Sequence, residues 1–313
     1  MMNDNTRVTA RYRSSQFAIA LVALVTLLGA CSSTESSTES STELSTELST
    51  ESSTESSAAA SRVVQAPDWG HIHNLSLVGD VVYLGTHNGF WKQEVDQEPI
   101  LVSQPAFDVM GLAGSLDRWL ASGHPGPDTD APSNLGLIES VDGGVTWQSV
   151  SLSGEVDFHR AEAVGDFVLG LAAHSGSLLR STDGGGTWSD LGVPSIFDFA
   201  INPANPDLIF ATSENGTLRS EDGGETFAPV TTPELLAFLA WGDQGLYAAS
   251  TEGQILFTKD LGANWDLRGS LGAAPGALAA DAGNLVAVVD DSIWGSTDEG
   301  LTFVKRIAGS GQH

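Results

Sequence analysis

The segment Ser140–Trp147, SVDGGVTW, is repeated along the chain with small changes. Four further copies follow it: STDGGGTW at 181–188, SEDGGETF at 220–227, TKDLGANW at 258–265 and STDEGLTF at 296–303. We call these five segments the Asp turns, after their third residues Asp142, Asp183, Asp222, Asp260 and Asp298, which are spaced by 41, 39, 38 and 38 residues. A period near 40 residues, with short β-rich runs between turns, is typical of four-stranded propeller blades.

The residue types of an Asp turn suit a tight hairpin. The aspartate can accept backbone N–H groups across the turn, the glycine permits a positive φ, and the aromatic ring can cover the hairpin. A calcium loop is the alternative, but these segments lack its serial Asp/Asn ligands and closing glutamate. We therefore expect the Asp turns to be structural and to join the third and fourth strands of each blade.

Counting strands backward from each Asp turn divides the folded part into six blades. The predicted ranges are 71–104, 105–153, 154–192, 193–231, 232–270 and 271–309. The first blade has Gly89–Lys92 where an Asp turn would be, and the second is longer because of the loop His124–Pro132. Val63 and Val64 are candidates to close the ring against a neighbouring blade. The predicted fold class is all-β, a six-bladed β-propeller.

The Asp turns resemble the Asp-box, S-x-D-x-G-x-T-W, of the BNR-repeat propellers, a sialidase-like and Vps10-like superfamily. The resemblance covers nearly all of residues 64–309 and implies a propeller with Asp-box hairpins. Bacterial relatives of this kind are commonly labelled glycosyl hydrolases. Likeness to Vps10-like or photosystem-assembly-like propellers implies protein or peptide binding instead.

The N-terminus has the pattern of a bacterial lipoprotein. Residues 1–30 combine three arginines with an apolar run at 17–28 that is too short to span a bilayer, and Leu28-Gly-Ala-Cys31 resembles a lipobox. We expect a signal peptide over 1–30, lipid on Cys31, a disordered Ser/Thr/Glu tether over 31–61 and the propeller over 62–313. The expected location is lipid-anchored on the membrane and exposed outside the cytoplasm, at the cell surface or in the periplasm.

The net charge limits the classes of molecule that we expect the chain to bind. With 13 Lys and Arg against 40 Asp and Glu, the chain carries a formal charge of −27. Such a negative field disfavours nucleic acid and anionic lipid surfaces and attracts cations. The lipid is therefore the expected membrane contact, and the expected ligand is a glycan, a peptide or a metal ion.

Histidines gather in the first half of the folded part, where propeller topology puts them on the face opposite the Asp turns. Inner-strand starts place His73, Asp108 and His159 in equivalent positions, with Asp198 following in the fourth blade. The ends of second strands add His87, His124 and His174 to the same face, and His71 shares the orientation of His73. The predicted ligand-binding residues are therefore His71, His73, His87, His124, His159 and His174.

This set of side chains has three interpretations. Imidazole with carboxylate suits a transition metal, for which His73, His159, Asp108 and Asp198 are the candidates. Carboxylates could instead serve a glycoside hydrolase as acid and base, with Asp108, Asp157 and Asp198 as catalytic candidates and Asp68 nearby. The third interpretation is that these polar groups only bond neighbouring turns.

A sialidase is disfavoured by the residues themselves. Recognition of sialic acid needs a grip of three arginines, and the family pattern adds an F/Y-R-I-P segment and a tyrosine nucleophile. The chain has no Arg-Ile-Pro, and Arg180 and Arg219 directly precede Asp turns on the opposite face. Tyr83 and Tyr247 fall inside second strands. We expect a ligand-binding module, with a glycoside hydrolase of another type as the alternative.

Overall fold

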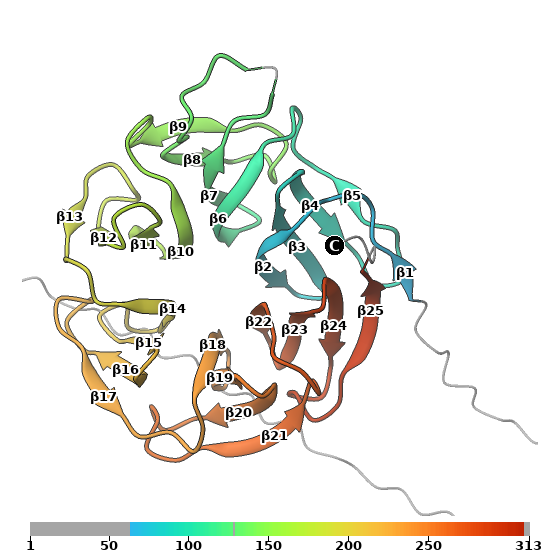
Figure 1. The fold of residues 1–313 in the computed structure, drawn as a ribbon, viewed down its shortest axis with the longest axis vertical. Coiled ribbons are helices and arrows are strands. Elements are labelled where there is room, and N and C mark those ends of the chain that lie inside the picture. Colours follow the sequence, from blue (N-terminus) through green and yellow to red (C-terminus); the bar gives the residue numbers. More distant parts are fainter. Residues whose placement is uncertain (1–62, 128, 310–313) are drawn as a thin grey trace, which may run out of the picture. The chain divides into compact units, whose positions relative to one another are not determined.

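The computed structural model describes residues 63–127 and 129–309. The predicted signal peptide, the lipidation site Cys31 and the tether lie outside the described residues. In the described part, 25 strands form six sheets arranged around a common centre, so the fold is a six-bladed β-propeller (Figure 1). Within these residues no helix is long and apolar enough to cross a membrane.

The first three blades are four-stranded antiparallel sheets whose strands pair in chain order. Blade 1 contains β2 (Ile72–Val78), β3 (Val81–Thr86), β4 (Gly89–Gln93) and β5 (Ile100–Leu101). Blade 2 contains β6 (Asp108–Ser115), β7 (Arg118–His124), β8 (Leu137–Ser140) and β9 (Gln148–Ser151). Blade 3 contains β10 (Phe158–Val164), β11 (Phe167–Ala172), β12 (Leu178–Ser181) and β13 (Ser189–Asp190).

The other three blades repeat this order, and all six fall within the predicted ranges. Blade 4 contains β14 (Ile196–Ile201), β15 (Ile209–Ser213), β16 (Gly216–Ser220) and β17 (Ala228–Val230). Blade 5 contains β18 (Leu236–Gly242), β19 (Gly245–Ser250), β20 (Gln254–Thr258) and β21 (Asp266–Ser270). Blade 6 contains β22 (Ala277–Asp281), β23 (Asn284–Val289), β24 (Ser292–Ser296) and β25 (Val304–Ala308).

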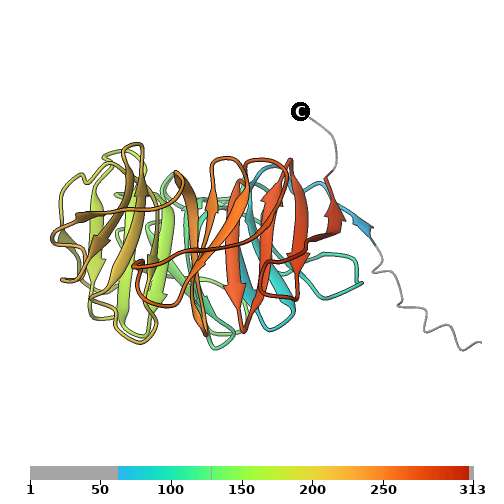
Figure 2. The same ribbon diagram turned by 90° about the horizontal axis from the view of Figure 1, so that it is seen from below.

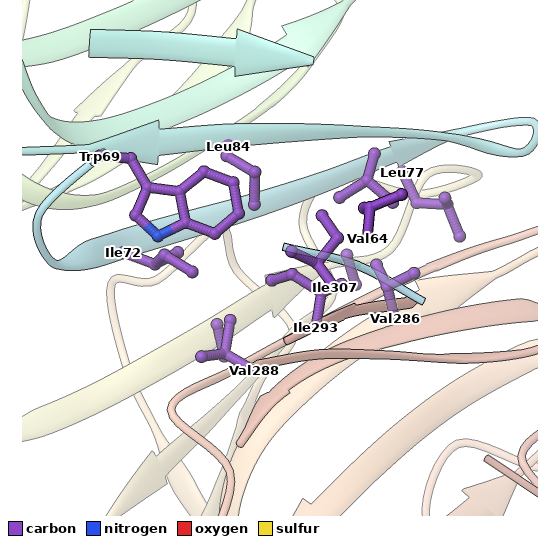
Figure 3. Packing of buried hydrophobic residues seen from close by; sticks show 12 residues of the cluster. Val64, Trp69, Ile72, Leu77, Leu84, Val286, Val288, Ile293 and Ile307 are labelled. Carbon is purple, nitrogen blue, oxygen red and sulfur yellow. The ribbon is translucent and has the colours of Figure 1, made fainter. Parts of the chain in front are cut away.

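The ring is closed by the first described strand. β1 (Val64–Gln65) pairs in parallel with β25, Val64 opposite Ile307, so blade 6 gains a fifth strand from the other end of the chain. Figure 3 shows Val64 and Ile307 in the apolar cluster that joins blade 6 to blade 1. The sequence-based expectation for Val64 is confirmed.

Burial follows the position of a strand in its blade. The second strands are buried on both sides, as in β19, where every residue is buried, because each lies between two neighbouring blades. Outer strands such as β21 are mostly exposed. Trp69 and Trp119 are 1% and 0% exposed, so both belong to the core.

The two faces of the ring carry different connections (Figure 2). Each described Asp turn shares an edge with the turn between the first and second strands, as when Gly184 N donates to Asp166 O at 2.8 Å. Inner-strand starts and second-strand ends meet on the other edge, where Asp108 is opposite His124. We call this second edge the His/Asp face.

Each Asp turn is closed by its own hydrogen bonds. In blade 3, Thr187 N donates to Asp183 Oδ1 at 2.8 Å and Thr187 Oγ1 donates to Oδ2 at 2.7 Å. Ser181 Oγ donates to Asp183 Oδ1 at 2.7 Å and accepts Gly185 N at 2.8 Å. These bonds favour the ionised form and lower the pKa of Asp183 to about 2. Gly185 has φ +97°, and a Cβ there would collide with Leu137 of the preceding blade.

Arginines tie three of the Asp turns, those of Asp183, Asp222 and Asp260, to the blade before them. Arg118 Nη2 donates to Gly184 O at 2.7 Å, Arg180 Nη1 to Asp222 O at 3.2 Å and Arg219 Nη1 to Leu261 O at 3.3 Å. Arg180 and Arg219 therefore do lie on the Asp-turn face, as the topology predicts. The Asp turns and these guanidinium groups together hold the blades in register.

Candidate functional site

The His/Asp face is shaped by a bulge in the inner strand of five blades. The pairing of first and second strands skips one residue, and the skipped residues are His73, Met110, His159, Phe197 and Ala237. A β-bulge changes the direction of the side chain it carries, and bulges are frequent next to functional sites. His73 and His159 are therefore equivalent, as predicted.

The same pairing corrects the predicted alignment for two aspartates. Asp108 comes two residues before its bulge, and Asp157 occupies the same position in blade 3. Asp198 follows its bulge by one residue. The prediction that Asp108 and Asp198 are equivalent to His73 is therefore wrong. It aligned the inner strands on the turns that follow them, and the position of the bulge relative to that turn differs from strand to strand.

The first cluster joins blades 1 and 2. His73 Nε2 lies 3.2 Å from Asp108 Oδ1, and His87 Nδ1 lies 3.1 Å from Asp108 Oδ2. One ligand atom from each of the three residues fits within 4.8 Å of the others. His73 Nε2 and Asp108 Oδ1 are both buried and neither makes a hydrogen bond, although they face one another. We call these three residues the first His/Asp cluster.

The surroundings of His73 favour the neutral form of its ring. Burial lowers the pKa of His73, the charge of Asp108 raises it, and the nearby His71, His87 and His159 lower it further. The ring of His71 packs edge-on at 5.1 Å from that of His73, and His71 Nδ1 lies 3.9 Å from Asp291 Oδ1 of blade 6. A neutral imidazole is the form that binds a metal ion.

The second cluster joins blades 2 and 3. His159 Nε2 lies 2.8 Å and His124 Nε2 lies 3.5 Å from the same oxygen, Asp157 Oδ2. His124 Nδ1 is 2.8 Å from the backbone oxygen of Ser133, in the long loop of blade 2. Asp157 is 8% exposed, and its Oδ1 atom is buried without a hydrogen-bond partner. We call His124, Asp157 and His159 the second His/Asp cluster.

Both clusters repeat one relation between adjacent blades. A histidine at the end of a second strand, His87 or His124, reaches the aspartate at the start of the next inner strand, Asp108 or Asp157. At the junction of blades 6 and 1 the two residue types are exchanged. The carboxylate, Asp291, follows the second strand of blade 6, and the imidazole, His71, precedes the inner strand of blade 1. Three successive junctions thus carry an imidazole–carboxylate contact, and sequence reasoning missed Asp291 because no motif marks it.

Asp198 belongs to neither cluster, contrary to its predicted role as ligand or catalyst. Arg160 Nε donates to its Oδ1 atom, and Leu239 N of blade 5 donates to Oδ2 at 2.8 Å. Asp198 is only 3% exposed and both oxygens are engaged. Its register on the inner strand turns it toward the neighbouring blades, so its carboxylate ties blades 3, 4 and 5 together.

The inner strands also enclose a cavity of about 140 Å³, lined by residues of blades 1, 2, 3, 5 and 6. Glu162 is its acidic group: it lies 3.8 Å from Arg160 and accepts Ile201 N at 2.9 Å. Burial raises the pKa of Glu162 to about 7, more than the charge of Arg160 lowers it. Its side chain is still 25% exposed to this cavity. No sequence motif marks this residue.

The remaining candidates lie apart from the clusters. His174 is exposed in the turn after β11, and Asp68 is exposed with its backbone oxygen accepting Asn88 Nδ2 at 3.2 Å. Tyr83 and Tyr247 are buried at 6% and 0% exposure in β3 and β19. Neither tyrosine can reach a solvent-borne substrate as a nucleophile, which agrees with the departure from the sialidase pattern.

Comparison with known proteins identifies the architecture. No family model matches the chain, and no curated protein matches it. Among solved structures it is similar to YCF48 bound to a D1 peptide, at 17% identity over 78% of this chain and 84% of that one, with a TM-score of 0.51. The nidogen/laminin complex matches at 9% identity over 69% and 88%, with a TM-score of 0.54.

A third solved structure, the ancestral GH74 enzyme AFV00434, covers 75% of this chain but 38% of its own, at 14% identity and a TM-score of 0.49. Identities this low establish the propeller fold alone. Binding and catalysis must therefore be argued from the side chains of the His/Asp face.

Proposed function

We propose that this protein is a lipid-anchored, extracytoplasmic propeller of the Asp-box type that binds a transition-metal ion on its His/Asp face. The first His/Asp cluster, His73, His87 and Asp108, supplies the ligands. The anchor follows from the apolar export segment and from Cys31, the single cysteine of the chain. The Asp-box assignment follows from the repeated hydrogen bonds of the Asp turns.

One observation carries the metal proposal: two buried ligand atoms, His73 Nε2 and Asp108 Oδ1, face one another without a hydrogen bond. A buried polar atom without a partner is costly, and a cation between the two would compensate it. The separations of His73 Nε2 from Asp108 Oδ1, 3.2 Å, and of His87 Nδ1 from Asp108 Oδ2, 3.1 Å, are slightly shorter than the roughly 3.3–3.6 Å between ligands of a tetrahedral site with bonds of about 2.0–2.2 Å. An ion would therefore need only a small outward shift of the side chains.

The cluster would leave part of the coordination sphere open. Three protein ligands on a tetrahedral ion leave a fourth position for water or a bound molecule. His87 is 63% exposed, so that position would be accessible from solvent. Two imidazoles with one carboxylate suit zinc or copper more than magnesium or calcium, which prefer oxygen ligands. The acidic chain would also raise the local cation concentration.

Zinc titration of the purified full-length protein tests the proposal. We expect binding in the wild type and at least roughly 100-fold weaker binding at this cluster in His73→Ala/His87→Ala, since even residues that only orient metal ligands contribute about 10–100-fold. His174→Ala is the matched control, because His174 lies in an exposed turn of the same face. Unchanged zinc affinity and stoichiometry in the double variant would refute the proposal.

The alternative, a glycoside hydrolase, has a separate readout. Asp108 and Asp157 would have to act as acid and base, and each already contacts two imidazoles. Turnover of a chromogenic glycoside by the wild type, abolished in Asp108→Asn, would replace the binding-module proposal by the hydrolase.

The anchor has its own test. A Cys31→Ser variant, expressed in a bacterium that processes lipoproteins, should move from the membrane fraction to the soluble fraction. The wild type should carry a mass increase on its N-terminal peptide. Membrane retention of the Cys31→Ser protein would contradict lipid anchoring.

A further inference from the structure

We propose that the pocket beside the long loop of blade 2 binds an uncharged small molecule that has an apolar ring and a hydroxyl or carbonyl group. The pocket has a volume of about 530 Å³ and is lined by the connection from blade 1 to blade 2, by the loop that follows β7 and by the sheet of blade 2. Sites for small molecules usually have roughly 300–1,000 Å³. No residue of either His/Asp cluster lines this pocket, so the inference goes beyond the proposed function and is independent of it.

The loop that borders the pocket is specific to blade 2. The second and third strands are joined there by residues 125–136, whereas residues 173–177 make the same connection in blade 3 and the other blades have shorter ones. In Figure 1 this loop extends outward from the ring between β7 and β8. Long loops without strands of their own are commonly functional. The extra length of blade 2 thus supplies one wall of a pocket.

The walls are held in place by contacts within the protein. Thr129 Oγ1 donates to Gly126 O at 3.1 Å inside the loop. Gly126 lies so close to the connection from blade 1 that a Cβ atom would come within 2.2 Å of Ala106 O. Pro125 and Pro132 also line the pocket, and their rings restrict the backbone of the loop. A pre-organised pocket of this kind loses little conformational freedom when a ligand binds.

The inner side of the pocket is apolar and aromatic. Phe107 and Ile138 are only 8% and 6% exposed, and the ring of Trp147 packs edge-on at 5.5 Å from that of Phe107. Trp147 Nε1 already donates to Gly144 O at 2.9 Å, so the indole offers the pocket its carbon surface. Aromatic rings pack well against another ring, which favours a ligand with an apolar ring.

Uncharged polar groups lie at the outer side of the pocket. Gln104, Ser149 and Ser153 are exposed residues of its lining, and their side chains make no hydrogen bond with another described residue. The hydroxyl of Thr146, in contrast, donates to Asp142 Oδ2 at 2.6 Å. A free amide and two free hydroxyls can each donate and accept a hydrogen bond. They therefore suit a hydroxyl or carbonyl group at one end of the ligand.

The absence of charge in the pocket selects the class of ligand. Charged residues make up 17% of the chain, yet none of the described residues that line the pocket is charged. A charged ligand would lose hydration there without gaining an ionic partner. An anion would in addition meet the negative field of a chain with a net charge of −27. An uncharged ligand has neither cost.

Binding of 2-naphthalenemethanol to the full-length protein tests the inference, because this uncharged alcohol combines an apolar ring system with one hydroxyl group. We expect calorimetry to show that it binds the wild type, and that 2-naphthoate, its charged counterpart, binds at least roughly tenfold more weakly. Ser149→Trp would place an indole in the pocket and should weaken binding of the alcohol by at least roughly tenfold. Gln148→Trp is the matched control, because Gln148 precedes Ser149 on β9, faces the other side of the sheet and does not line the pocket.

The inference is overturned if the wild type does not bind the alcohol, or if Ser149→Trp binds it as tightly as the wild type. Equal affinity for 2-naphthoate would overturn the selection of uncharged ligands. Nuclear Overhauser contacts give a second readout: we expect them between the naphthalene protons and the rings of Phe107 and Trp147, and contacts only with other residues would contradict the site. His73→Ala/His87→Ala should lose zinc but keep the alcohol, so failure of the metal proposal and failure of this inference are distinguishable.

Discussion

The two faces of this propeller both carry aspartates, in different surroundings. On the Asp-turn face, both oxygens of Asp183 accept hydrogen bonds from Thr187, and Ser181 adds a third. On the His/Asp face, Asp108 and Asp157 are more deeply buried, yet each has an oxygen without a hydrogen-bond partner. Of these three carboxylates, the exposed Asp183 has both oxygens bonded by the protein, whereas the buried Asp108 and Asp157 each have one oxygen without a hydrogen bond.

This difference separates structural from binding roles. A carboxylate whose bonds are all made within one hairpin has no oxygen left for a ligand, and it stabilises that hairpin in the five blades that have an Asp turn. A buried carboxylate with an open oxygen and two imidazoles is unfavourable for stability alone and suited to a cation. Residue type alone does not make this distinction, but the count of bonds at each oxygen does.

The largest expected effect concerns Asp198, a buried carboxylate whose two oxygens both accept hydrogen bonds. If such a carboxylate has a structural role, removal of one donor should destabilise the fold. Arg160→Met would leave the buried carboxylate of Asp198 without its guanidinium partner, at a cost of about 3–5 kcal/mol in the free energy of unfolding. Arg219→Met, which breaks a more exposed contact with Glu221, is the control and should cost about 1 kcal/mol or less. Urea unfolding measures both.

If Arg160→Met unfolds at nearly the wild-type urea concentration but no longer binds zinc, Asp198 contributes to metal binding and not to stability. That outcome would mean that bonding of both oxygens does not exclude a carboxylate from the ligand set.

A smaller effect is expected on the Asp-turn face and depends on pH. The hydrogen bonds from Thr187 and Ser181 hold the pKa of Asp183 at about 2, below the value of 3.8 expected without them. The stabilisation is therefore present above about pH 4 and is lost as the pH falls toward 2. The difference in unfolding free energy between wild type and Asp183→Asn should shrink across that window. A difference that stays constant from about pH 5 to 2 would show that ionisation of Asp183 contributes nothing.

The fold was predictable because its signal is local and repeated. Each Asp turn is closed by residues within eight positions of one another, so the five copies in the sequence identify five hairpins and their spacing identifies the blades.

The site was predictable only to the level of a face. Topology correctly sends His73, His87, His124 and His159 to one side. It cannot reveal the bulges, because an added residue in an inner strand leaves no signature in hydrophobic pattern or turn spacing. The contact of Asp108 with two histidines and the contact of Asp198 with Arg160 both depend on where these bulges fall.

Residues that depend on contacts between distant blades could not be found from the sequence. Glu162 titrates unusually only because the inner strands of several blades enclose it. Asp291 meets His71 across the closure of the ring, 220 residues away in sequence and 3.9 Å away in space. Only the closed ring brings such pairs together.

The central claim is that the His/Asp face binds a transition-metal ion through His73, His87 and Asp108. A crystal of the protein grown with zinc, with diffraction recorded on both sides of the zinc absorption edge, tests it most directly. The account predicts an anomalous peak about 2.0–2.2 Å from His73 Nε2 and from a carboxylate oxygen of Asp108, with an imidazole nitrogen of His87 completing the set. A zinc-saturated crystal with no anomalous peak at this cluster would contradict it.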